Sequence, residues 1–350
     1  MTNPEANPKT HVCADGGLPG PWAEREGGAP VEIITARAVP LGGPRAMNVR
    51  RTLPQRQRSL IGAWCFLDHY GPDEVTATGG MDVAPHPHTG LQTLSWLFEG
   101  TIAHIDSGGH SAHVLPGEMN LMTAGAGICH SETSTPGTER LHGVQLWIAL
   151  PEEARHRPER RFENFVPDPV EFDGGSALVF LGSLLGSRSP VRTHTPLVGA
   201  EIGLEPGRTL DLSVDPGFEH GLLVDTGEAV TLEGVHVPKD AVGYTGVDNR
   251  TLRIANGGDG PARLVFLGGA PFTEEVLMWW NFLGRSMEEI RRYRQEWQDH
   301  GERFGRVEGY VGHGGPGRNR EGMDRLPAPE LPPVRIRPRK NPPPHARFQD

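Results

Sequence analysis

The stretch "HPHTGLQTLSWLFEGTIAHIDSGGHSAHVLPGEMNLMTAGAGICHSE", residues 86–132, decides the fold of this 350-residue chain. Short apolar runs alternate with turn signals at Glu99–Gly100, Ser107–Gly109 and Pro116–Gly117, about every 8 to 16 residues. Regular strand spacing of this kind indicates a β-sandwich or a β-barrel. The stretch also begins with HPH and ends with HSE, so it carries side chains that can bind a metal.

The rest of the chain repeats this rhythm. A second β-rich series runs from about residue 177 to 270, and the chain contains 47 glycines and 33 prolines, which favour short strands and turns over long helices. We therefore predict an all-β fold in which the second half is another copy of the first. The predicted divisions are a flexible leader (1–29), a first β domain (30–165), a second β domain (166–285), a helix (286–300) and an extended tail rich in Gly, Pro and Arg (301–350).

One helix is expected, after the sequence MWWNFLGR. Ser286 and Glu289 have the spacing of a capping box. Ile290, Tyr293 and Trp297 then recur at three- and four-residue spacing, which gives the helix one buried face. The preceding aromatic residues, Trp279, Trp280 and Phe282, are expected to dock this helix on the second β domain.

Composition excludes several classes of protein. A formal net charge of -10 argues against direct nucleic-acid binding, which needs Lys and Arg to neutralise phosphates. No apolar run approaches the length of a membrane span, and the N-terminus lacks the pattern of a signal peptide. Three widely spaced cysteines, at 13, 65 and 129, form no disulfide framework. We expect a cytoplasmic protein, and a monomer.

The two short motifs suit a metal. Side chains two residues apart on a strand point to the same face, so His86 pairs with His88 and His130 pairs with Glu132. Three imidazoles and one carboxylate suit Fe, Mn, Ni, Cu or Zn. A six-coordinate ion would keep two positions open for substrate or dioxygen. The alternative for HPH alone is a solvated turn, but glycines before both motifs favour a shared metal site.

These residues also carry a resemblance. The 86–132 stretch resembles the signature of the pirin family within the cupin superfamily, as do RRTLPQRQRSLIGAWCFLDHYGP (50–72) and APFTEEVLMWWNFLGRSMEEI (270–290). The resemblance implies a bicupin of two β-barrel (double-stranded β-helix) domains, the first holding Fe²⁺ and the second without a site. The implied iron ligands are His86, His88, His130 and Glu132. Gln92 departs from the family, which often has Glu there.

The same resemblance implies a function. Some pirins resemble quercetin 2,3-dioxygenases, which insert dioxygen into a flavonol or a related enolic or catecholic substrate, and Glu132 is the ligand that could also accept the substrate proton. One alternative is a non-enzymatic, redox-responsive regulator that binds protein partners. Another is a bicupin whose metal only stabilises the fold.

Other residues near the motifs are assigned structural roles. Cys129 should face away from the ligands and serve as a small packing residue. His104, His110 and His113 are expected to be ordinary strand and loop histidines, and Asp106 is expected to form a turn. In the second half His220 and His236 are not spaced as a ligand pair.

Overall fold

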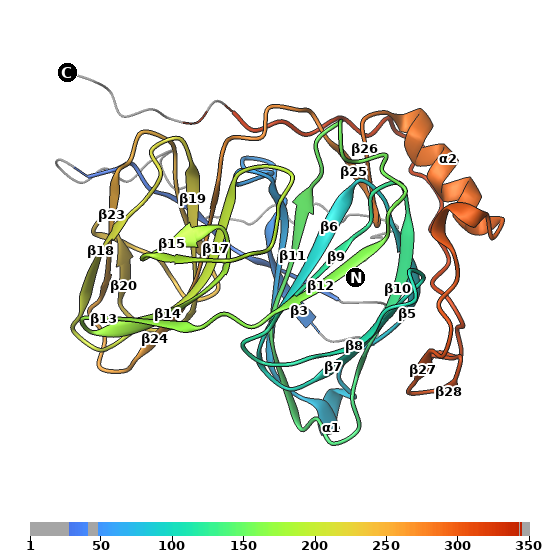
Figure 1. The fold of residues 1–350 in the computed structure, drawn as a ribbon, viewed down its shortest axis with the longest axis horizontal. Coiled ribbons are helices and arrows are strands. Elements are labelled where there is room, and N and C mark those ends of the chain that lie inside the picture. The colour runs from blue at the N-terminus through green and yellow to red at the C-terminus, as the bar shows by residue number, and fades with distance from the viewer. Residues whose placement is uncertain (1–27, 41–47, 343, 345–350) are drawn as a thin grey trace.

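The computed structural model describes residues 28–40, 48–342 and 344. It consists of two β-barrels that lie side by side, with one helix at the outer end of the first barrel (Figure 1). The predicted all-β architecture of two similar domains is confirmed. Nearly all of the predicted leader, residues 1–27, lies outside the described residues.

The first barrel is built from two antiparallel sheets that face each other. Its seven-stranded sheet contains, in spatial order, β12 (Arg161–Phe165), β9 (Met119–Thr123), β6 (Leu91–Glu99), β11 (Arg140–Ala149), β4 (Trp64–Glu74), β3 (Asn48–Leu53) and β2 (Arg37–Pro40). Its four-stranded sheet contains β5 (Asp82–His88), β10 (Ile128–Ser134), β7 (Ile102–Asp106) and β8 (Ser111–Val114). A four-residue helix, α1 (Val75–Thr78), follows β4.

The second barrel repeats this plan. Its seven-stranded sheet contains β1 (Glu32–Ile34), β22 (Val242–Thr245), β19 (Glu219–Thr226), β24 (Ala262–Gly269), β17 (Leu197–Leu204), β14 (Gly175–Leu181) and β13 (Pro169–Phe172). Its four-stranded sheet contains β18 (Thr209–Ser213), β23 (Thr251–Asn256), β20 (Val230–Leu232) and β21 (Val235–His236). A small hairpin joins β15 (Ser183–Leu184) to β16 (Ser187–Arg188).

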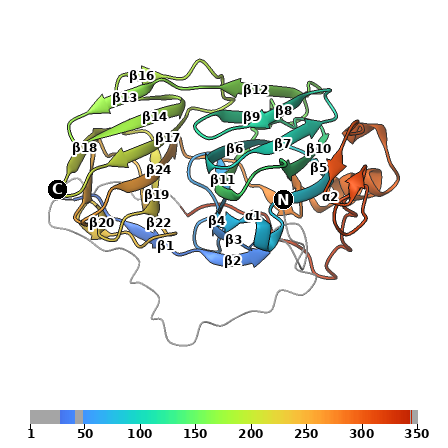
Figure 2. The ribbon, with the colours of Figure 1, turned by 90° about the horizontal axis from the view of Figure 1, so that it is seen from below.

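The two seven-stranded sheets pack against each other and form the interface between the barrels (Figure 2). Alternate residues of each strand point into this interface, and one continuous hydrophobic cluster contains side chains from both barrels. Trp96 and Phe180 meet there with ring centroids 4.7 Å apart, and the Trp96 indole N–H donates to Glu201 at 2.7 Å. Burial of these apolar faces joins the barrels.

Two short segments pack on a different barrel from the one to which the predicted domain boundaries assign them. β1, within residues 30–165, pairs with β22 of the second barrel, where Glu32 stands opposite Tyr244. The hairpin of β25 (Leu277–Trp279) and β26 (Phe282–Gly284), within residues 166–285, forms a bridge from Phe282 to Thr89 of the first barrel. Each segment forms hydrogen bonds with a sheet edge or a loop of the other barrel. Such a distant partner cannot be identified from the local sequence.

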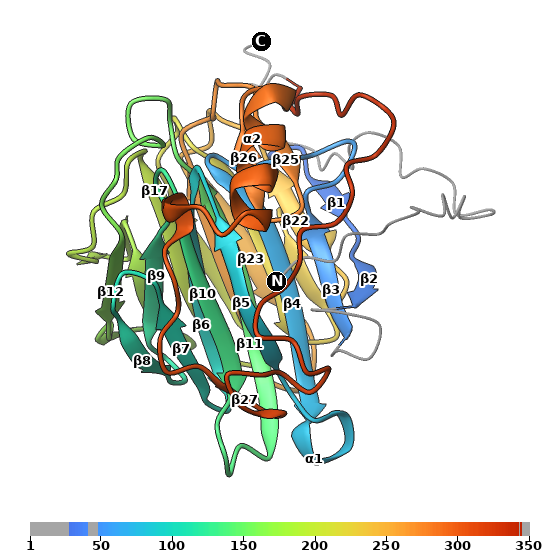
Figure 3. The ribbon, with the colours of Figure 1, turned by 90° about the vertical axis from the view of Figure 1, so that its right-hand side faces the viewer.

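The predicted helix is confirmed as α2 (Met287–Gln298), but its expected docking site was wrong. The Ser286 hydroxyl accepts from the Glu289 amide, and Ile290, Tyr293 and Trp297 are buried. These side chains pack with Phe282 and Cys129, so the helix covers the outer face of the first barrel beside β5 and β10 (Figure 3). The reason is the β25–β26 hairpin, which carries the chain back across to the first barrel before the helix begins.

The segment after α2 continues along the first barrel. It forms a 3-10 turn η1 (Glu302–Phe304) and a hairpin of β27 (Val311–Gly312) and β28 (Gly315–Pro316). The Tyr310 hydroxyl donates to Asp82 at 3.0 Å, so the segment is held on the barrel rather than freely extended. None of the described helices has the length and apolar character needed to cross a membrane.

Candidate metal centre

The two sequence motifs lie on neighbouring strands of the first barrel. β5 pairs antiparallel with β10, and His86 stands directly opposite His130. β5 is the edge strand of its sheet, as Pro87 predicts, because proline cannot donate to a second neighbour. His86, His88 and His130 therefore share the inner face, and one ring nitrogen of each lies within 4.8 Å of the others.

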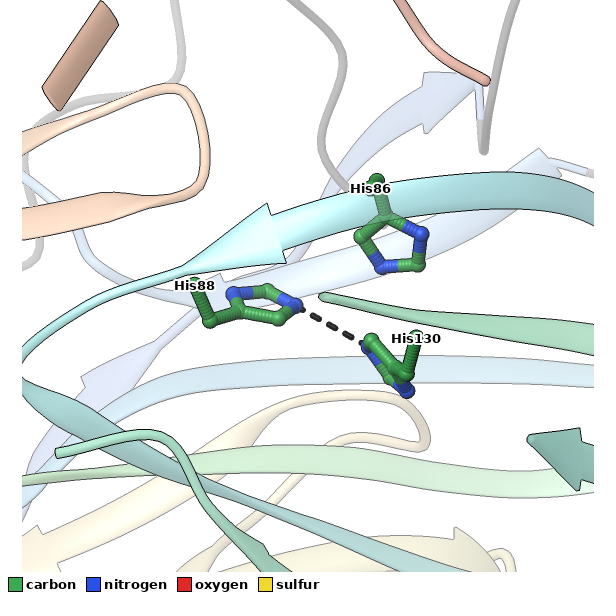
Figure 4. A group of neighbouring side chains, drawn as sticks. All are labelled: His86, His88 and His130. Atoms are coloured by element: carbon green, nitrogen blue, oxygen red, sulfur yellow. Dashed lines mark hydrogen bonds between the residues drawn. The ribbon is translucent and has the colours of Figure 1, made fainter. Parts of the chain in front are cut away.

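The three rings lie close together (Figure 4), and hydrogen bonds to backbone carbonyls orient two of them. His86 Nδ1 lies 3.0 Å from the Ala84 carbonyl, and His88 Nδ1 lies 3.2 Å from the Asn281 carbonyl in the β25–β26 hairpin. A backbone carbonyl only accepts, so each Nδ1 carries the proton and each Nε2 keeps its lone pair. His88 Nε2 lies 3.1 Å from His130 Nε2, within the spacing that ligands of one metal ion adopt.

Glu132 lies beside this group without being in it. Its carboxylate forms a second group with His104 and His130, so His130 belongs to both groups. The register of β10 against β5 shifts between His130 and Glu132, at a β-bulge, which re-aims the side chain. Among the described residues, Glu132 Oε2 is buried with no hydrogen-bond partner, so this oxygen can accept a bond from a bound molecule or ion.

Burial controls the charge of these groups. It lowers the pKa of His86, His88 and His130 well below the ordinary value, and neighbouring histidines lower it further. Burial raises the pKa of the Glu132 carboxyl. Neutral imidazoles are the form that binds metals, so the site favours a cation without competition from protons on the three rings.

His104 and Asp106 extend the site, and sequence reasoning missed the role of His104. His104 Nδ1 lies 3.3 Å from His130 Nδ1, and its Nε2 lies 3.3 Å from Asp106 Oδ2. Asp106 Oδ1 also accepts from the Gly108 amide at 2.7 Å, which confirms the predicted turn. The sequence did contain a signal for this role. His104 and Asp106 are two residues apart on one strand and therefore point to the same face, and they stand opposite Glu132 and His130 of the HSE motif.

The facing sheet supplies the other wall. The Trp147 ring meets the His88 ring edge to face, with centroids 5.1 Å apart. Arg51 donates to both oxygens of Asp68 at 2.6 and 2.7 Å, and Ser95 donates to Gln145 at 2.8 Å. The strand register sets Asp68, Gln145 and Ser95 in one row, so this wall combines a polar row with an aromatic surface.

In the second barrel, the strands equivalent to β5 and β10 are β18 and β23, and their inward-facing side chains are apolar. β18 and β23 place Leu210 opposite Ile254 and Leu212 opposite Leu252, and all four side chains lie in the hydrophobic core of that barrel. Aliphatic side chains have no atom that binds a metal. His220 lies on β19 of the other sheet and is buried, whereas His236 is exposed.

A cavity of about 700 Å³ lies on the outer side of the β5–β10 pair, between it and the C-terminal segment, and Pro85, Cys129 and Tyr310 line it. Cys129 faces away from the ligands, as predicted. Its side chain packs against α2, and burial raises the pKa of its thiol to about 11, so the reactive thiolate is scarce. The prediction of a packing residue is confirmed.

Comparison with known proteins agrees with this architecture. The pirin domain matches residues 46–148, and the pirin C-terminal cupin domain matches residues 199–305. A putative quercetin 2,3-dioxygenase of Pseudomonas aeruginosa is 42% identical over 86% of this chain and 91% of its own length. A pirin-like protein of Caulobacter vibrioides is 32% identical over 77% of this chain and 96% of its own length.

The fold is also found in a crystal structure. A quercetin 2,3-dioxygenase of Acinetobacter baumannii superimposes with a TM-score of 0.79 and 37% identity, covering 88% of this chain and 97% of that one. The range matched by the pirin domain, residues 46–148, includes both the HPH and the HSE motif. The chain belongs to the pirin family, and its fold is that of a bicupin.

Proposed function

We propose that the first barrel binds one Fe²⁺ ion through Nε2 of His86, His88 and His130 and an oxygen of Glu132, and that the loaded protein is a quercetin 2,3-dioxygenase-type enzyme. The observation that carries the proposal is the convergence of three imidazole nitrogens within 4.8 Å, with Nδ1 of His86 and His88 held by backbone carbonyls. Names of two relatives, in Pseudomonas and Acinetobacter, support the reaction class.

The donor set fits a transition ion of this kind. Three imidazoles and one carboxylate are borderline ligands that suit iron, and a six-coordinate ion would keep two positions for small molecules. When bound, the ion would supply Lewis acidity and one-electron chemistry. The chain supplies ring orientation, through Ala84 and Asn281, and a buried surrounding that excludes bulk water.

Glu132 is proposed to accept the proton of the substrate hydroxyl. Its burial raises the pKa of the carboxyl, and a carboxylate with a raised pKa is a better proton acceptor near neutral pH. Oε2 has no hydrogen-bond partner among the described residues, so it is available for a hydroxyl. The product of this step is an electron-rich enolate or catecholate, which is the form that reacts with dioxygen.

Substrate access requires movement in the protein. His86, His88, His130 and Glu132 are each at most 1% exposed, so a flavonol cannot reach them in this conformation. The β25–β26 hairpin lies against the site, where the Asn281 carbonyl holds His88 and the Leu283 amide bonds to Thr89 at 3.1 Å. We propose that displacement of this hairpin admits the substrate.

Oxygen consumption tests the proposal. Protein loaded anaerobically with Fe²⁺ is mixed with quercetin and then with dioxygen, and uptake is followed with an electrode. Uptake is expected for the native chain, is expected to vanish in His88→Ala, and is expected to persist in His236→Ala, which removes an exposed histidine of the second barrel. Absence of turnover with a panel of flavonols, enols and catechols, in protein that holds its iron, would exclude the dioxygenase.

A further inference from the structure

A second cluster of metal-binding side chains lies between the two barrels. His69 on β4 and His142 on β11 come from the first barrel, and Asp225 on β19 comes from the second. One ligand atom of each lies within 4.8 Å of the others, and all three residues are buried. None of them takes part in the site described above.

The three donor atoms converge closely. Asp225 Oδ1 lies 2.9 Å from His69 Nε2 and 2.7 Å from His142 Nε2, and the two nitrogens lie 3.3 Å apart. Ligand atoms around a tetrahedral zinc ion, with bonds of about 2.0–2.1 Å, stand roughly 3.3 Å apart. The nitrogen pair already has this spacing, and a shift of about half an ångström at the carboxylate would complete it.

The contact on the far side of His69 fits the role of a metal ligand. His69 Nδ1 lies 3.1 Å from Asp240 Oδ1, so carboxylates face both nitrogens of this buried ring. A neutral imidazole has only one N–H and can donate to only one of them, whereas an imidazolium would donate to both. A metal ion at Nε2 leaves Nδ1–H for Asp240, which is the carboxylate–histidine–metal arrangement of known sites.

The surroundings of Asp225 turn Oδ1 toward the two histidines. Arg263 Nη1 lies 3.2 Å from Oδ2, the oxygen that does not face the histidines. Asp240 and Arg263, which contact the cluster, are partly exposed, at 26% and 36%, so the cluster lies close to the protein surface.

We propose that His69, His142 and Asp225 bind a second divalent transition-metal ion of the zinc class, which links the two barrels. Three protein ligands leave a fourth position for water. The proposal does not depend on the dioxygenase or on the metal of the first barrel. The competing arrangement is a proton-bridged Asp–His–His cluster that binds no metal.

Zinc stoichiometry tests the proposal in the full chain. A His86→Ala/His88→Ala background removes the first site, and the protein is stripped with a chelator, reloaded with Zn²⁺ and dialysed before elemental analysis. One zinc ion per chain is expected in this background, and adding His142→Ala is expected to lower the content at least tenfold. The matched control adds His113→Ala, an exposed histidine on β8, and should keep the ion.

Two measurements keep the test decisive if His142→Ala misfolds. Asp225→Asn preserves the shape of the side chain and should also lose the zinc. Crystals of the native chain grown with Zn²⁺ should show an anomalous difference peak between His69 Nε2, His142 Nε2 and Asp225 Oδ1. A background variant that holds no zinc, or a zinc-soaked crystal without a peak between these atoms, would overturn the proposal in favour of the proton-bridged cluster.

Discussion

His104 meets His130 through their Nδ1 atoms, which lie 3.3 Å apart. On its other side, His104 Nε2 lies 3.3 Å from Asp106 Oδ2. If Nε2–H of His104 donates to the carboxylate, its Nδ1 can accept from His130 Nδ1–H, which leaves His130 Nε2 with a lone pair toward His88. In this arrangement Asp106 orients the candidate metal ligand His130 through the ring of His104.

We predict that His104→Ala weakens metal binding by about 10- to 100-fold, because partners of this kind fix ligand orientation and raise ligand basicity. Competition with a chromogenic chelator measures the affinity. His113→Ala, on the paired strand β8 but exposed, is the control and should bind as tightly as the native chain. Equal affinity in His104→Ala would show that His130 needs no such support.

Glu132→Gln should separate binding from proton transfer. The amide keeps the shape of the side chain but is not a base, so turnover with quercetin is expected to fall by about 10²- to 10⁴-fold. Metal content, measured by elemental analysis on the same sample, is expected to fall much less because three imidazoles remain. Native turnover in protein that retains its metal would remove Glu132 from the reaction.

His220→Leu should make the chain more stable in acid. His220 is buried, and neither of its ring nitrogens has a hydrogen-bond partner among the described residues. Burial lowers its pKa from 6.5 to about 4, so between these values the unfolded chain binds more protons than the folded chain. The native protein therefore loses up to about 3 kcal/mol of stability as the pH falls through this window.

Urea unfolding at pH 5 and pH 7.5, in the presence of a chelator, measures this effect. The difference in unfolding free energy between the two pH values should shrink in His220→Leu by one to a few kcal/mol, roughly the linkage of one histidine. His236→Leu replaces an exposed histidine of the same barrel and should keep the native pH dependence. If the difference in unfolding free energy between pH 5 and pH 7.5 is the same in His220→Leu as in the native chain, the folded state does not lower the pKa of this ring.

Phe180→Ala should weaken the contact between barrels. The ring is fully buried in the shared hydrophobic cluster and lies against Trp96. Loss of a buried phenylalanine costs about 3–5 kcal/mol, and chemical denaturation measures it. Val166→Ala, at a position 58% exposed, should change stability by less than about 0.5 kcal/mol. If Phe180→Ala lowers the free energy of unfolding by no more than Val166→Ala does, the barrels fold independently of this contact.

Local sequence predicted the features that depend on local chemistry. Turn spacing predicted the strands, the capping residue Ser286 predicted the start of α2, and alternation on β10 predicted that Cys129 faces away from His130. The HPH and HSE motifs place His86, His88 and His130 in one group, whereas Glu132 lies in a neighbouring group with His104, and their role as a metal site stays a prediction. Iron, the dioxygenase reaction and the regulatory alternative stay predictions, since no spacing of ligands distinguishes them.

Features that depend on distant pairing could not be read from the sequence. His69 and Asp225 are 156 residues apart and meet only because two sheets pack back to back. The same holds for β1, which crosses to the second barrel, and for the β25–β26 hairpin, which returns to the first. The similarity between the two halves of the sequence predicts two barrels, but it does not predict which faces of the barrels form the interface.

The HPH and HSE motifs are proposed to hold one metal ion together. Anomalous diffraction from crystals grown anaerobically with Fe²⁺, recorded above and below the iron edge, tests it most directly. One peak is expected in the first barrel at bonding distance, about 2.1 Å, from Nε2 of His86, His88 and His130, with Glu132 turned toward it. A first barrel without an iron peak, in crystals that hold iron elsewhere, would contradict it.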